Sequence, residues 1–165
     1  MNVKNTKRYS DFEFPPYAFI PGHHPHPEKE GGHMLSLRLP FHSFDLINPR
    51  SCQTFLYAID LMNFQYYWEA HVYLEELWNE QNRKGILADF FKCLIKICAA
   101  GVKFKMSQYD IAIQHLIRAQ DLIINLEPLS MELPIDLVIL NKSIANSTKQ
   151  IKNSFNIKVE IKRSN

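Results

Sequence analysis

The sequence lacks the long apolar runs and the charge excess that mark membrane-spanning and nucleic-acid-binding proteins. Its apolar runs fall far short of the roughly 20 residues that a spanning helix needs. Its net charge is only +2, from 19 basic and 17 acidic residues, whereas nucleic-acid binding calls for a clustered basic face. No apolar stretch of a signal peptide follows the polar segment 1–10. We therefore expect no membrane and no nucleic-acid partner.

Cysteine and glycine are scarce as well. Three cysteines, Cys52, Cys93 and Cys98, show no paired metal-ligand spacing, and the last two lie among apolar residues, where a free thiol acts as a small hydrophobe. Five glycines can hardly build a phosphate-binding loop or a dinucleotide fingerprint, and there is no nucleophile elbow. The sequence thus predicts no cofactor and no metal, and a reducing cytoplasmic location.

The chain has the size and composition of one ordinary globular domain. Its 165 residues are 46% hydrophobic and 22% charged. A domain of this length buries roughly 70% of its unfolded surface, so it needs no disulfide or metal to fold.

Residues 1–47 show no helical periodicity and contain six of the nine prolines. Proline fixes φ and biases the preceding residue toward extended geometry. The segment is nevertheless too apolar for a free tail. We predict an extended N-terminal arm that packs on the body and buries its rings, with apolar side chains at Phe12, Phe14, Tyr17, Phe19 and Ile20.

From residue 48 to residue 155, apolar residues recur at steps of three and four, which predicts a helical domain of about five helices. Asn48 can cap the first, with Pro49 at its first position. The others are predicted at 65–81, at 86–106, from a Ser107 cap to 126, and from Pro134 to 151. The helix at 86–106 is apolar nearly all round and should be the central one.

A faint internal repeat relates two of these helices. Four residues, Tyr67, Ala70, Leu74 and Leu77, recur 42 positions later as Tyr109, Ala112, Leu116 and Ala119. The spacing resembles the second helix of tetratricopeptide-like units. The predicted fold is therefore all-α: two such hairpins and a C-terminal helix, with the arm attached. Close helix packing explains the repeat without any binding function.

The chain ends on a basic tail, predicted at 156–165. Within it, the segment 157–162 alternates apolar and charged residues, as a short strand would. The sequence leaves open whether this segment is the edge of a sheet or a solvated tail.

The second predicted helix carries an aromatic and acidic motif. It resembles the signature of a bacterial family catalogued as domain of unknown function 309, which has Glu-Ala-His-Glu and a Glu three residues before Trp. The resemblance rests on Trp68-Glu69-Ala70-His71, Glu75 and Trp78, on the apolar segment 90–100, and on the arm motifs Pro15-Pro16-Tyr17, Pro21-Gly22, Pro25-His26-Pro27 and Gly32-His33. Val72 departs from the family pattern, which has a second Glu there. The resemblance implies a helical bundle and no established activity.

Within this motif, five polar and aromatic residues form the candidate site: Trp68, Glu69, His71, Glu75 and Trp78. His71 and Glu75 are four residues apart and so share a helix face. A histidine beside a carboxylate is a plausible general base or half of a metal site. The alternative is a buried structural network in which Glu75 orients His71 and the helix is tied to the arm. No His-Glu-x-x-His metalloprotease pattern is present.

The arm adds four histidines within eleven residues: His23, His24, His26 and His33. Imidazoles are common metal ligands, yet this spacing fits no recognised zinc arrangement. His26 and His33 match the arm of the family, so these two are candidates for docking onto the body.

The sequence favours a non-enzymatic interaction or scaffold module with a protein partner or self-association. The alternative is a hydrolase-like enzyme for a small molecule, using His71 with Glu69 or Glu75. Sequence alone leaves open whether the protein is an enzyme.

Overall fold

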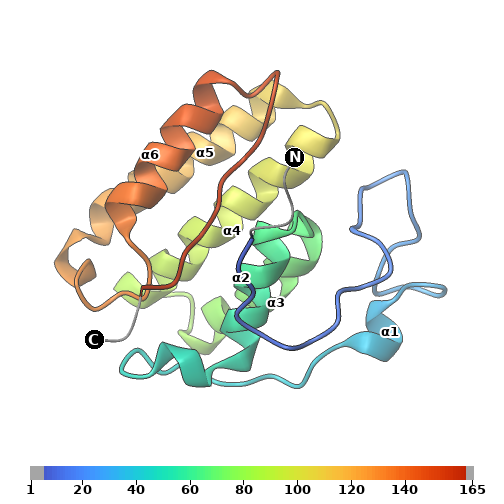
Figure 1. The fold of residues 1–165 in the computed structure, drawn as a ribbon, viewed down its shortest axis with the longest axis horizontal. Coiled ribbons are helices and arrows are strands. Elements are labelled where there is room, and N and C mark those ends of the chain that lie inside the picture. Colours follow the sequence, from blue (N-terminus) through green and yellow to red (C-terminus); the bar gives the residue numbers. More distant parts are fainter. Residues whose placement is uncertain (1–5, 163–165) are drawn as a thin grey trace.

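The structure, a computed structural model, describes residues 6–162 and is built from helices, as the sequence predicts (Figure 1). Helices of both kinds make up more than half of these residues. The only sheet-like pairing among them is a single antiparallel bridge between Ile135 and Ile161. The helices are α1 (Met34–Leu37), α2 (Gln53–Asn63), α3 (Tyr67–Glu80), α4 (Ile86–Lys105), α5 (Tyr109–Asn125) and α6 (Leu137–Lys149), with 3-10 turns at Pro49–Ser51 and Glu127–Leu129.

Helix α4 lies at the centre of the body. It packs against α3 on one side and α5 on the other, while α2 packs on α3 and α6 on α5. Consecutive helices are thus neighbours in space. The prediction that this helix is the central one is confirmed, and α4 buries Phe90, Phe91, Leu94, Ile97 and Cys98. It is not the most completely buried helix, because in α2 every residue except Gln53 is buried.

Two predicted helix caps are wrong. Asn48 precedes a 3-10 turn and its side chain makes no cap bond; α2 begins later, where Cys52 Sγ accepts a hydrogen bond from the Phe55 N–H at 3.3 Å. Ser107 has a left-handed backbone (φ 59°) in the turn between α4 and α5, so it cannot cap. In α6 the cap is Asp136, which accepts from the N–H groups of Val138 and Ile139.

The N-terminal segment crosses the body in an extended conformation and contains α1, which the sequence did not predict (Figure 1). Its rings pack on the helices. Phe14 stacks on Tyr66 with ring centroids 5.1 Å apart, and Phe12 meets Tyr57 edge-on at 5.7 Å. These contacts remove apolar rings from water, which favours an ordered arm.

A buried carboxylate on α2 holds the start of this segment. Asp60 is fully buried and accepts hydrogen bonds from the N–H groups of Tyr9 and Ser10, both at 2.8 Å. The Ser10 hydroxyl donates a third at 2.7 Å. A buried charge is tolerated only with such partners, so the carboxylate and the arm depend on each other.

Over residues 157–161 the C-terminal segment is an extended segment packed on the body rather than a solvated tail. It runs back beside α6 (Figure 1), and Ile157, Val159 and Ile161 are buried. The Asn63 side chain donates to the Val159 carbonyl and accepts from the Val159 N–H, both at 2.8 Å. One side chain of α2 therefore replaces a neighbouring strand.

Replacing Asp60 by Ala should destabilise the protein by about 2 to 5 kcal/mol, because the Tyr9 and Ser10 donors would lose their acceptor. Urea unfolding followed by circular dichroism measures this. The matched control is Asp136→Ala, which removes an exposed helix cap and should cost about 1 kcal/mol. Equal losses for the two variants would contradict a special role of Asp60.

Gly101→Ala should also destabilise, by about 1 to 3 kcal/mol. A Cβ at this position would lie 2.4 Å from Cγ of Tyr67, whose ring is buried between α3 and α4. Helix propensity alone favours Ala over Gly by about 1 kcal/mol. A loss of stability would therefore have to come from the clash with the Tyr67 ring. A variant as stable as the parent in urea would show that the two helices can separate without cost.

Candidate functional site

The predicted site residues divide between two faces of α3. Glu69 faces the arm and its side chain is 1% exposed, whereas the His71 side chain is 30% exposed. Residues two apart on a helix point in nearly opposite directions, because each step turns about 100°. The structure therefore does not bring Glu69 and His71 together, and the pairing of these two residues in the predicted enzyme alternative is wrong.

Glu69 attaches the N-terminal arm to α3 by hydrogen bonds. Its Oε1 accepts a hydrogen bond from the Phe19 N–H at 2.8 Å and lies 3.1 Å from His33 Nε2. With Glu69 ionised, the imidazole donates through its Nε2–H. The other two atoms of the pair, Glu69 Oε2 and His33 Nδ1, are buried without a hydrogen-bond partner in the described part of the chain. The pair joins residues 36 positions apart, so it fixes the path of the arm.

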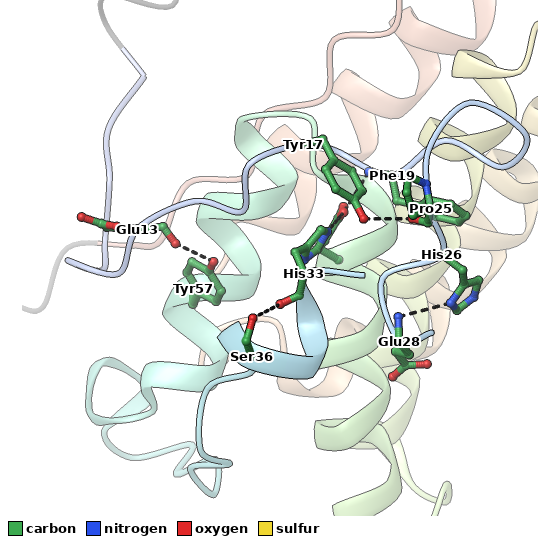
Figure 2. A network of polar contacts seen from close by, with 10 residues as sticks. Glu13, Tyr17, Phe19, Pro25, His26, Glu28, His33, Ser36 and Tyr57 are labelled. Carbon is green, nitrogen blue, oxygen red and sulfur yellow. Dashed lines mark hydrogen bonds and ion pairs between the residues drawn. The ribbon is translucent and has the colours of Figure 1, made fainter. Parts of the chain in front are cut away.

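Aromatic rings surround this pair. Tyr17 meets the His33 ring edge-on at 4.6 Å, and its hydroxyl donates to the Pro25 carbonyl (Figure 2). Trp68 meets Phe19 edge-on at 5.2 Å and His26 at 5.0 Å. Both arm candidates, His26 and His33, thus lie against the first turn of α3. The rings exclude water from the carboxylate.

Exclusion of water shifts the protonation of both partners. Burial raises the pKa of the Glu69 carboxyl to about 7, opposed by its hydrogen bonds to backbone N–H groups. Burial also lowers the pKa of His33 below its ordinary value, since the charged imidazolium loses hydration. Both shifts favour the neutral forms, so this pair holds the arm mainly by hydrogen bonding rather than by ion pairing.

His71 and Glu75 form the second group, on the outer face of α3. His71 Nε2 lies 3.2 Å from Glu75 Oε1, and the Glu75 side chain is 45% exposed. Glu75 is thus placed to orient His71, as predicted, but the pair is partly exposed rather than buried. The Trp78 indole N–H has no hydrogen-bond partner within residues 6–162, and the Arg83 guanidinium lies 4.8 Å over its ring. The arm is held instead by Glu69 and Asp60.

Two residues that hold the extended segments were missed at the sequence level, Asp60 and Asn63. Their signal is a polar side chain inside an otherwise apolar stretch of α2. Buried polar residues of this kind almost always have a specific partner. Among residues 6–162, no three His, Cys, Asp or Glu side chains are grouped so that they could hold a metal ion. No helix of that range has the length and hydropathy needed to cross a bilayer.

The protein is thus a small helical domain whose N-terminal arm is fixed to α3 by the Glu69–His33 pair, with the His71–Glu75 pair on the outer face of the same helix. Residues 55–114 match the family described as "Domain of unknown function (DUF309)". The match runs from α2 into α5 and confirms the resemblance over that part of the chain. No curated protein and no solved structure matches the chain.

The protonation of Glu69 gives a pH-dependent prediction. The native state holds a proton on this carboxyl up to about pH 7, whereas the unfolded chain releases it near 4.5. Between pH 4.5 and about pH 7 the native state binds more protons than the unfolded chain. The contribution of Glu69 to the free energy of unfolding is therefore lost as the pH rises through that range. Glu69→Gln cannot titrate, and its stability relative to the parent should rise by about 2 to 3 kcal/mol between about pH 5 and pH 8.

Urea unfolding of both proteins at the two pH values tests this. His33 works in the opposite direction, because its lowered pKa makes stability rise with pH below 6.5, but it is present in both proteins and cancels. Glu127→Gln, at an exposed position, is the matched control. A difference between Glu69→Gln and the parent that stays constant with pH would mean that Glu69 is not desolvated.

Proposed function

We propose that the protein is a non-enzymatic interaction module whose α5–α6 face contacts a partner protein. The observation that carries this proposal is a group of apolar side chains left in water on two neighbouring helices. Ile124 is 71% exposed and Val138 is 64% exposed, and Ile117 on the same side of α5 is also exposed. Exposed large apolar side chains that gather in one place are a feature of interaction surfaces.

One hydrogen bond between α5 and α6 locates these side chains relative to one another. Gln120 on α5 donates to Asn141 on α6 at 2.7 Å, which joins the two helices at the surface. Ile117 and Ile124 are three and four residues from Gln120, and Val138 is three residues from Asn141, so all three share the face of that bond. The α5–α6 face, as we call it, consists of Ile117, Gln120, Ile124, Val138 and Asn141. An amide pair ringed by aliphatic side chains suits a protein partner.

The enzyme alternative retains one pair, His71 with Glu75. Glu69 is committed to the arm, where its two contacts at Oε1 and its burial leave it away from solvent. The α5–α6 face is favoured over this pair, because burying its three large apolar side chains against a partner would lower the free energy of the complex.

A photo-reactive amino acid at Ile124 tests the proposal in cells that make the full chain. A partner on the α5–α6 face should give one discrete cross-linked species, which is lost when Ile117→Ser is added. The matched control places the same amino acid at Leu35 on α1, which is similarly exposed but far from α5 and α6 (Figure 1). His71→Ala should leave the cross-link unchanged. Cross-links of equal yield from both positions, or none from Ile124, would overturn the proposal.

A further inference from the structure

A second feature of the surface concerns charge. Three lysines, Lys92, Lys96 and Lys103, follow one another on α4 at intervals of four and seven residues, so they form one stripe. Arg118 and His115 of α5 lie beside this stripe, close enough that their charges act on one another. We call these five residues the basic cluster.

The members of the cluster repel one another. The pKa of Lys96 is lowered by burial and then by the charges of Arg118 and Lys92. The pKa of His115 is lowered by burial and then by Lys96, Arg118 and Lys103. Burial is the larger cause of each shift, and the neighbouring positive charges add to it by making protonation harder. No carboxylate of residues 6–162 forms an ion pair with any member of the cluster.

Other basic side chains of the protein form ion pairs or hydrogen bonds within the fold. Arg38 pairs with Glu28 and Glu76, Lys105 donates to Gln65, and Lys162 donates to the Ser130 carbonyl. The basic cluster has no such contacts, and the buried Nδ1 of His115 has no partner among the described residues either. Basic groups that lie side by side and pair with no carboxylate of residues 6–162 are suited to meet an anion from outside.

We propose that the basic cluster binds an acidic helical segment of a partner protein; the inference rests on the proposed interaction role. Lys92 and Lys103 are eleven residues apart, or about 16 Å along the helix axis at 1.5 Å per residue. One phosphate cannot span that distance, whereas an extended polyanion can. A helix laid along α4 with Glu residues at four- and seven-residue spacing presents one carboxylate to each lysine.

Acidic borders argue against a nucleic-acid backbone. Asp89 lies one turn before Lys92 on α4, and Asp121 lies one turn after Arg118 on α5. Because α4 and α5 run antiparallel, with Cys93 level with Ala119, both carboxylates lie at the Lys92 end of the cluster, where they would repel a phosphate chain that continued past it. The low net charge of +2 points the same way.

The test measures binding of a fluorescent, helix-forming peptide with Glu at that spacing to the full chain, by anisotropy. The Lys96→Gln/Arg118→Gln variant should bind at least about tenfold more weakly than the parent, with the difference shrinking at high salt. The same peptide with Gln in place of Glu should not bind. The matched control, Lys142→Gln/Lys149→Gln on α6, removes the same charge from exposed positions and should bind as the parent does.

Folding is checked separately. Because the substitutions relieve repulsion, the Lys96→Gln/Arg118→Gln variant should be at least as stable as the parent in urea. Equal weakening by the α6 control would reduce the result to net charge and overturn the proposal. Tighter binding of a single-stranded oligonucleotide than of the Glu peptide would overturn it in favour of nucleic acid. The α5–α6 cross-link uses other residues, so either result can fail without the other.

Discussion

A carboxylate buried in an apolar helix must find hydrogen-bond donors elsewhere in the chain, and the rest of this structure depends on that requirement. Asp60 on α2 and Glu69 on α3 are both fully buried. Their donors are backbone N–H groups of the extended arm, at Tyr9, Ser10 and Phe19. An extended segment has N–H groups with no helical partner, which would be costly to bury unpaired. Each side thus satisfies the other, and a segment without regular structure acquires a fixed path.

The same principle holds other extended segments on α2 and α3. Asn63 pairs with both backbone groups of Val159, and Thr54 accepts from the His42 N–H at 2.8 Å. The Glu80 carboxylate accepts from the Phe44 N–H at 3.1 Å. Polar side chains on these two helices therefore act as anchors for the N-terminal and C-terminal segments. Their cost of burial is offset only while those segments stay in place, so the body and both segments should unfold together.

Sequence reasoning predicted the parts that local pattern determines. Spacing of three and four placed the helices, and the i, i+4 relation placed His71 beside Glu75. It missed the partners of Glu69, because Phe19 and His33 lie 50 and 36 residues away in a segment without periodicity. It misplaced the start of α2, because Asn48 and Pro49 are good helix-start residues that here begin a 3-10 turn. Local preference cannot reveal a contact that the tertiary fold creates.

The chemistry of the chain is divided between its helices in a way that bears on function. On α2 and on one face of α3, the polar side chains Asp60, Asn63 and Glu69 turn inward and hold the extended segments. On α4, α5 and α6 the unusual side chains turn outward, as unpaired cations near Arg118 and aliphatic groups near Gln120. Natural sequences are locally consistent, and departures without compensation gather at functional sites. Repelling charges and hydrated isoleucines are such departures. The two surfaces lie on opposite flanks of α5, the cations toward α4 and the aliphatic groups toward α6, so an acidic segment would compensate the first and an apolar partner surface the second.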